Sequence, residues 1–168
     1  MAHENNSLVP ALGDWHANLI YLARTPLVIC VNDCSLLSVL VPGRDFPQII
    51  SSIQRRIVKR LERMRLATDV IANEEAAMEV VAVQPSNSKS VLGSMNDFVH
   101  SLKWRRAQFD LAEVDSLEEM LSQTPMGALS YKYPVEVAYE VFSNAGKRVA
   151  EANELRIVVA RSRDKISS

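Results

Sequence analysis

The stretch that decides the fold is Asn18–Val41, NLIYLARTPLVICVNDCSLLSVLV, because it contains three short apolar runs separated by turn-forming residues. The runs are Asn18–Leu22, Leu27–Val31 and Leu36–Val41. Each is rich in β-branched or other apolar side chains, and the breaks between them contain proline, asparagine or aspartate. Short runs of this kind, with a few turn residues between them, predict antiparallel β-hairpins.

The spacing of the apolar residues changes after this predicted meander. Between Phe46 and Met64 they recur every three or four positions, which is the period of one helix face. Asp45 and Gln48 have the spacing of a capping box at a helix start. The pattern therefore predicts a long helix from Asp45 to about Leu66.

The rest of the chain predicts a fourth strand and several helices. The expected elements are a short helix at 70–78, a strand at 80–83, and helices at 90–106, 115–122 and 134–142. The segment Leu155–Ala160 has β-like composition and leaves three alternatives open, namely an edge strand, a helix extension or a partner-binding arm. The expected fold class is α+β (mixed α/β), with a small antiparallel sheet in β-β-β-α-β-α-α order and helices packed on one face.

The length of 168 residues is that of one domain. We expect a disordered N-terminus at 1–10, a single α/β domain at 11–143 and a C-terminal extension at 144–168. A hydrophobic content of 48% excludes disorder across the whole chain. The start of the chain lacks the features of a signal peptide, and no apolar run reaches the roughly 20 residues that span a bilayer. The expected location is therefore the cytoplasm.

The formal net charge of −1 provides no bulk attraction to nucleic acid or to anionic membranes. Any such binding would need a local patch. The only two cysteines, Cys30 and Cys34, lie in an apolar stretch with a spacing that is not typical of zinc or redox sites. We expect both to be reduced and buried, and to behave as small hydrophobic side chains.

Three segments resemble a bacterial family of domains of unknown function. They are Gly13–Leu19 (GDWHANL), Ser90–Asp97 (SVLGSMND) and Thr124–Leu129 (TPMGAL), the last followed by Tyr131 and Pro134. Their order and spacing match over most of the chain. The resemblance implies a small intracellular bacterial protein, and it implies no established activity, cofactor or catalytic residue.

Two basic clusters are candidates for a surface that binds nucleic acid or another acidic partner. The first lies on one surface of the predicted long helix, and the second surrounds a tryptophan; together they comprise Arg55, Arg56, Lys59, Arg60, Arg63, Lys103, Trp104, Arg105 and Arg106. Two structural alternatives stay open for the helix cluster. It can be a solvated helix face, or it can pair with an acidic block that contains no base, made of Asp110, Glu113, Asp115, Glu118 and Glu119.

A second candidate site is polar. It gathers groups before and within the first strand and on the helix that begins at Ser90, namely Asp14, His16, Asn18, Asn96, Asp97 and His100. An aspartate three residues before a histidine on one helix face can orient a general base, and a pair of histidines with an aspartate can bind a metal ion. The structural alternative is that these groups bond to loop backbones and tie the helix to the sheet.

The function that the sequence favours is a non-enzymatic binding or regulatory module. It would act through protein–protein contacts, with self-association into a small homo-oligomer as the expected case. The motifs of phosphate loops, zinc proteases and serine hydrolases are absent, and no cofactor or metal is expected. The first alternative is a nucleic-acid-binding accessory protein that uses the basic helix face, and the second is a small hydrolase or metal-dependent enzyme.

Overall fold

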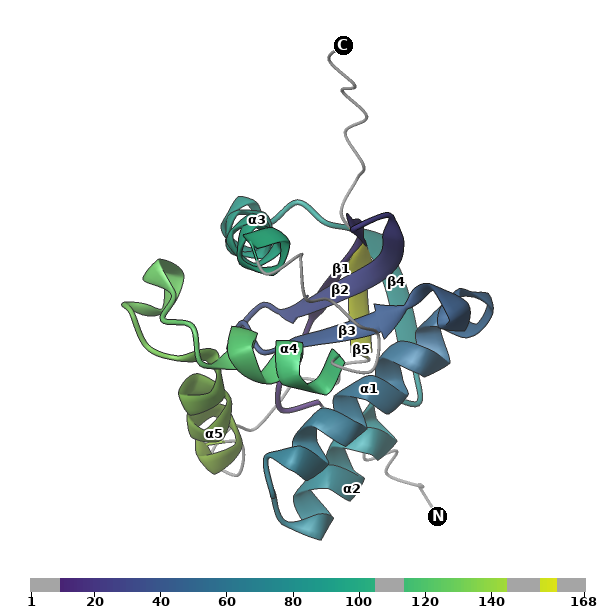
Figure 1. Ribbon diagram of the computed structural model, residues 1–168. Helices are drawn as coiled ribbons and strands as arrows, with labels where there is room; N and C mark the ends of the chain where they lie inside the picture. Colours follow the sequence, from purple (N-terminus) through teal and green to yellow (C-terminus); the bar gives the residue numbers. More distant parts are fainter. Residues whose placement is uncertain (1–9, 105–113, 145–154, 160–168) are drawn as a thin grey trace, which may run out of the picture.

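The computed structural model describes residues 10–104, 114–144 and 155–159 (Figure 1). Its strands are β1 (Trp15–Leu22), β2 (Thr25–Asn32), β3 (Ser38–Pro42), β4 (Val81–Pro85) and β5 (Leu155–Val159). Its α-helices are α1 (Ile49–Arg63), α2 (Thr68–Ala77), α3 (Lys89–Trp104), α4 (Val114–Ser122) and α5 (Pro134–Asn144). Two 3-10 helices, η1 (Gly43–Gln48) and η4 (Gly127–Leu129), complete the described elements.

The five described strands form one mixed sheet in the order β3-β2-β1-β5-β4. The predicted meander forms its first half, since β1 pairs antiparallel with β2 and β2 pairs antiparallel with β3. The second half is parallel, because β5 runs parallel to both β1 and β4. The predicted α+β class is confirmed, and the expectation of a purely antiparallel sheet is corrected to a mixed one.

Helices pack on both faces of the sheet, which corrects the prediction that they cover one face. In β2, Val28 and Cys30 belong to the apolar cluster that includes α1, whereas Leu27, Ile29 and Val31 belong to the cluster that includes α3 and α4. Successive side chains of a strand point to opposite faces, so the two clusters lie on opposite sides of the sheet. Figure 1 shows α1 and α2 on one side and α3 on the other.

The predicted long helix begins later than its apolar pattern suggested. Its first turns form η1, which contains Pro47, and neither Pro42 nor Gln48 at the starts of η1 and α1 makes a side-chain capping hydrogen bond. The predicted capping box of Asp45 and Gln48 is therefore wrong. Proline has no N–H to donate, so it suits the tight turn that leads into α1 but not the interior of a long helix.

The segment Leu155–Val159 is a strand, and it lies inside the sheet rather than at its edge. It separates β1 from β4, although β4 precedes it by about seventy residues in the chain. Of the three alternatives that the composition left open, a strand is confirmed and an edge position is wrong. The strand within the predicted C-terminal extension is thus paired on both sides with strands of the predicted domain.

The two cysteines have different environments. Cys30 is buried in β2, as expected, and burial raises the pKa of its thiol. Cys34 is exposed in the turn after β2, which corrects the prediction that both are buried. Neither forms a disulfide.

Glu74 of α2 ties the segment before β1 to the helix layer. Its buried carboxylate accepts the backbone N–H groups of Ala11 (2.8 Å) and Leu12 (3.3 Å). Burial raises the pKa of Glu74, and the two backbone hydrogen bonds oppose that shift. The contact places Leu12 in the core beside Trp15.

Asn32 organises the corner where β2 ends. Its side-chain amide donates to the carbonyl oxygens of Leu12 (2.7 Å) and Asp14 (3.0 Å), and its Oδ1 accepts from the backbone N–H and the hydroxyl of Ser35. The side chain is fully buried, so the Leu12 carbonyl and the Ser35 N–H would lose a buried partner without it, whereas the Asp14 carbonyl also accepts the N–H of Asp33 (3.1 Å). The amide therefore connects the entry of β1 to the turn between β2 and β3.

We predict that Asn32→Ala lowers the free energy of unfolding by about 3 kcal/mol, because it leaves buried carbonyl and N–H groups unpaired. Urea unfolding followed by circular dichroism measures the change. The control is Asn18→Ala in β1, whose half-buried amide makes no side-chain hydrogen bond to the described residues. An equal loss in the two variants would contradict the assigned role of Asn32.

Candidate functional site

The most extensive polar contact in the described structure joins α1 to α4 around Glu118. The Glu118 carboxylate is fully buried, and its Oε1 accepts from Arg56 Nε (3.1 Å) and Arg56 Nη2 (2.5 Å). Its Oε2 accepts from Arg63 Nη2 (2.5 Å). Oε1 also accepts the backbone N–H of Leu40 in β3 (2.8 Å), so one carboxylate connects two helices and the edge of the sheet.

Two further acidic residues of α4 complete the network. Asp115 accepts from Arg56 Nη2 (2.8 Å) and also pairs with Arg63. Glu119 pairs with Arg60 Nη1 (2.9 Å). Arg60 has only 1% of its side chain exposed, and it also donates to the hydroxyl of Ser122 (2.7 Å).

The helical period explains why these residues meet. Arg56, Arg60 and Arg63 are spaced by four and three positions, so they share one face of α1. Asp115 and Glu118 are three positions apart on α4 and face them. We call these arginines and carboxylates, with Glu119, the α1–α4 network; its three positive and three negative charges balance.

The pKa values of the residues in the network are shifted in different directions. Burial alone would lower the pKa of Arg56, but the charges and hydrogen bonds of Glu118 and Asp115 outweigh it and raise that pKa. Burial alone would raise the pKa of Asp115, but Arg56 and Arg63 outweigh it and lower that pKa. At Arg60 burial dominates and lowers the pKa, although Glu119 opposes the shift. The arginines remain charged at neutral pH because their ordinary pKa is far above it.

The α1–α4 network takes up three of the five basic residues that were predicted to form a surface on the long helix. Arg56, Arg60 and Arg63 pair with the acidic block inside the chain, as the second structural alternative expected for Asp115, Glu118 and Glu119. Arg55 and Lys59 are exposed and form no ion pair with the described residues. Asp110 and Glu113 of the acidic block lie outside the described residues.

The second basic cluster is only partly described. Lys103 and Trp104 are exposed at the end of α3, and Trp104 is the most exposed of the large apolar side chains described, at 90%. Arg105 and Arg106 lie outside the described residues. Since α3 packs on the opposite face of the sheet from α1, Lys103 and Trp104 do not extend the surface of Arg55 and Lys59.

The predicted polar site contains one buried histidine. His16 is buried in β1, and its Nδ1 lies 2.8 Å from the hydroxyl oxygen of Ser86, just after β4. Burial lowers the pKa of His16, and the charges of Asp33 and Asp14 oppose that shift. The imidazole is therefore neutral at pH 7 and ties β1 to the segment between β4 and α3.

Of the other predicted members, Asn96, Asp97 and His100 are exposed on α3, and Asn18 is half-buried in β1. Asp14 lies just before β1, and its charge acts on His16. Within the described residues, no hydrogen bond joins any of them to His16. No group of three or more histidine, cysteine, aspartate or glutamate side chains in the described ranges could hold a metal ion.

One residue with a defined polar role was not predicted. The sequence assigned no role to Ser86, and its pairing with His16 spans 70 positions of the chain, so no local pattern could reveal it. For Glu118, the spacing of the basic and acidic blocks indicated the pairing with α1. Its hydrogen bond from the Leu40 N–H was not predicted, because it joins residues 78 positions apart.

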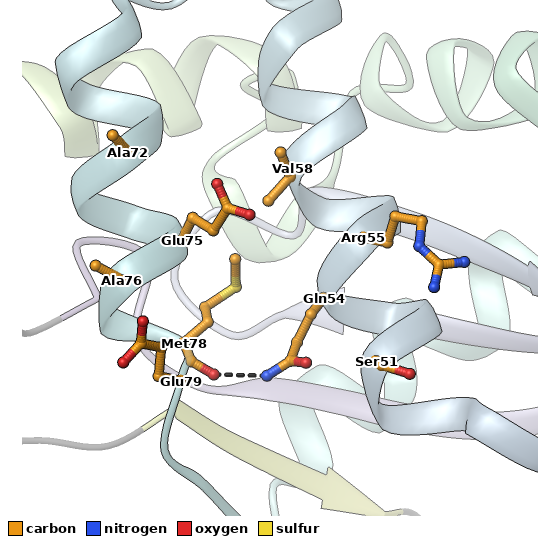
Figure 2. A pocket seen from close by; sticks show the side chains of 9 residues that line it. All are labelled: Ser51, Gln54, Arg55, Val58, Ala72, Glu75, Ala76, Met78 and Glu79. Atoms are coloured by element: carbon orange, nitrogen blue, oxygen red, sulfur yellow. Dashed lines mark hydrogen bonds between the residues drawn. The ribbon is translucent and has the colours of Figure 1, made fainter.

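Figure 2 shows a hollow between α1 and α2, which has a volume of about 650 Å³. Gln54 of α1 closes one end by donating to the carbonyl oxygen of Met78 (2.5 Å). The carboxylates of Glu75 and Glu79 come from the α2 side, and the guanidinium of Arg55 points away from α2. This lining contains no nucleophile paired with a base.

A smaller hollow lies between η1, α1 and the start of α4. Its volume is about 380 Å³. The charged residues around it are Arg44, Asp45, Arg55, Arg56, Lys59 and Asp115. Arg55 therefore separates the two hollows, and the second is bounded on one side by the α1–α4 network.

Comparison with protein families gives one match. The model of a domain of unknown function, DUF6933, matches residues 2–137 and includes all three segments on which the predicted resemblance rests. The prediction of a family of unknown function is thus confirmed. Comparisons with curated proteins and with solved structures find no match. None of the described helices is both long enough and apolar enough to span a membrane.

We predict that Glu118→Ala lowers the free energy of unfolding by about 3–5 kcal/mol, because two guanidinium groups and the Leu40 N–H lose a buried partner. Chemical denaturation measures the loss. The control is Glu62→Ala on the exposed face of α1, for which we expect a change within about 0.5 kcal/mol. Near-equal stabilities of Glu118→Ala and the wild type would show that the network is not structural.

The lowered pKa of Asp115 predicts a pH dependence. A carboxyl group whose pKa is lower in the folded state stabilises the fold above its ordinary pKa of 3.8, and this contribution is lost as the pH falls through the folded value. Because the side chain is 53% exposed, we expect Asp115→Asn to cost less than about 1 kcal/mol at pH 7. The difference between wild type and variant should shrink below about pH 4. Urea titrations at pH 7 and pH 3 test this, and a difference that grows in acid would contradict it.

Proposed function

The chain belongs to the DUF6933 family, and we propose that it is a non-enzymatic binding module that acts through protein–protein contact, first of all with a second copy of itself. The observation that carries the proposal is an apolar strip on one face of the sheet whose side chains are exposed in the part of the chain that the structure describes. We call it the sheet strip, and it consists of Leu19, Tyr21, Val83, Pro85 and Val159.

The members of the sheet strip lie on one face. Alternate residues of a strand share a face, so Leu19 and Tyr21 point to the same side as the buried Trp15 and Ala17 of β1. Val159 is the register partner of Ala17, and it therefore shares that face. Pro85 is in turn the partner of Val159, and Val83 lies two residues before it in β4.

The strip is continuous across three strands. Leu19 is diagonal to Val159, which pairs directly with Pro85, and side chains in such positions lie within about 8 Å of each other. The exposed fractions are 47% for Leu19, 60% for Tyr21, 55% for Val83 and 43% for Val159. Isolated exposed apolar residues are ordinary, but a contiguous set on a flat sheet face is typical of an interaction site.

The strip ends at an edge of the sheet with which no further described strand pairs. At the opposite edge, Glu118 occupies the N–H of Leu40 in β3. β4 forms the other edge, and the N–H of Ser86 points inward to the carbonyl oxygen of Val159 (2.6 Å). Because N–H groups alternate in direction along a strand, those of Val81 and Val83 point outward, where a further strand could pair.

A second copy suits this edge for two reasons. Antiparallel pairing of β4 with β4 of another copy would extend the sheet and join the two strips into one apolar surface. The formal net charge of −1 gives little repulsion between copies. The sheet strip lies outside the α1–α4 network, so the contact would leave the buried charges undisturbed.

The alternatives have less support. Nucleic-acid binding by the basic helix surface loses Arg56, Arg60 and Arg63 to the α1–α4 network. A hydrolase centred on His16 and His100 lacks the contact between these side chains that it requires, since His100 is exposed on α3 and His16 bonds to Ser86.

We predict that the wild type dimerises with rising concentration, and that Val83→Pro and Val83→Lys each weaken dimerisation at least about tenfold. Val83→Pro removes an outward N–H of the β4 edge, whereas Val83→Lys brings like charges of the two copies together across the paired edge. Sedimentation equilibrium over a range of concentrations measures both.

The matched control is Trp104→Lys, which puts the same charge at a more exposed apolar residue on α3. We expect its dimerisation to equal that of the wild type. A wild type that stays monomeric at high concentration would overturn the proposal, and so would equal weakening by Trp104→Lys. Thermal melts establish that the variants are folded.

A further inference from the structure

The hollow between η1, α1 and the start of α4 carries more positive than negative charge. Of the six charged residues around it, four are cations and two are carboxylates: Arg44, Arg55, Arg56 and Lys59 against Asp45 and Asp115. Arg56 and Asp115 belong to the α1–α4 network, which is neutral as a whole. The remaining Arg44, Arg55 and Lys59 exceed Asp45 by two charges.

These excess cations are available to a ligand. Arg55 and Lys59 are exposed one helical turn apart on α1 and have no acidic partner among the described residues. Arg44 contacts Asp45 only at the limit of an ion pair, with Nε and Oδ1 4.0 Å apart, and its side chain is 73% exposed. The excess of positive charge around a concave site is expected to attract an anion into it.

Arg56 provides a fixed donor at the wall of the same hollow. Its Nε and Nη2 are bonded to Glu118 and Asp115, and only 14% of the side chain is exposed. Its Nη1 makes no hydrogen bond within the described residues. A guanidinium held in this way loses little conformational entropy when it donates a further hydrogen bond to an oxyanion.

We propose that this hollow is a binding site for a small phosphate dianion, such as a phosphate monoester, held by Arg55, Lys59 and Arg44 with Arg56 at its wall. The excess of two positive charges matches a dianion, whereas a carboxylate would neutralise only one of them. The planar guanidinium of an arginine can donate two parallel hydrogen bonds to two oxygens of a phosphate.

The shape favours a small ligand over a nucleic acid. The volume of about 380 Å³ lies within the range of small-molecule pockets, roughly 300–1,000 Å³. A nucleic-acid backbone would need cations along an extended path. In the described structure the path along α1 is interrupted, because Arg60 and Arg63 turn to α4.

The test is isothermal titration of the full chain with inorganic phosphate and with glycerol phosphate, each compared with acetate at matched ionic strength. We expect both phosphates to bind at one site per chain and acetate to bind at least about tenfold more weakly, since it carries half the charge. Lys59→Gln and Arg55→Gln should each weaken phosphate binding by about tenfold or more.

The control is Lys103→Gln on α3, which removes the same charge from another face of the molecule. We expect its phosphate affinity to equal that of the wild type. The proposal is overturned if Lys103→Gln weakens binding as much as Lys59→Gln, if acetate binds as well as phosphate, or if a short oligonucleotide binds while neither phosphate does. The exposed positions of Arg55 and Lys59 leave the fold intact, so the result is independent of the dimerisation that we propose for the sheet strip.

Discussion

The buried carboxylate of Glu118 is the contact on which the arrangement of α1, α4 and β3 depends. Burying a charged side chain away from water raises the free energy of the folded state unless most of its hydrogen-bonding capacity is used. Glu118 of α4 meets this condition with donors from two other elements, namely Arg56 and Arg63 of α1 and the Leu40 N–H of β3. Because the donors come from different parts of the chain, the charge is satisfied only when α1, β3 and α4 are all in place. The interaction therefore contributes to specificity, beyond any gain in stability.

The same contact determines which parts of the surface remain open. α4 lies along β3 and occupies an outward N–H of that edge, so further strand pairing is left to the β4 edge. On α1, the network uses Arg56, Arg60 and Arg63 and leaves Arg55 and Lys59 exposed beside the start of α4. A solvent-exposed apolar strip and a small cationic hollow thus remain on different parts of the molecule. They differ in the chemistry that they can recognise, and occupation of one does not require occupation of the other.

Local patterns predicted the identity of most elements, and they failed where the outcome depends on distant residues. The meander from Asn18 to Val41 and the apolar period of α1 are properties of neighbouring residues, and both were predicted. The position of β5 was not, because parallel pairing with β1 and β4 joins segments far apart in the chain. The double-sided core could have been predicted from Leu27–Val31. Every residue of this run is apolar, rather than every second one, and such runs are typical of strands buried on both faces.

Charge patterning predicted more of the candidate site than residue motifs did. The spacing of Arg56, Arg60 and Arg63 and that of Asp115 and Glu118 are both helical, so a match between the two blocks was a stated alternative. The sequence could not predict which basic residues of α1 would stay unpaired. That outcome depends on the rotation of α1 about its axis, which is determined by how Ile53, Ile57 and Leu61 pack on the sheet. That rotation buries Arg60 and exposes Lys59, its neighbour in sequence. The apolar face of the helix thus assigns the adjacent basic residues to two roles, one structural and one open to a ligand.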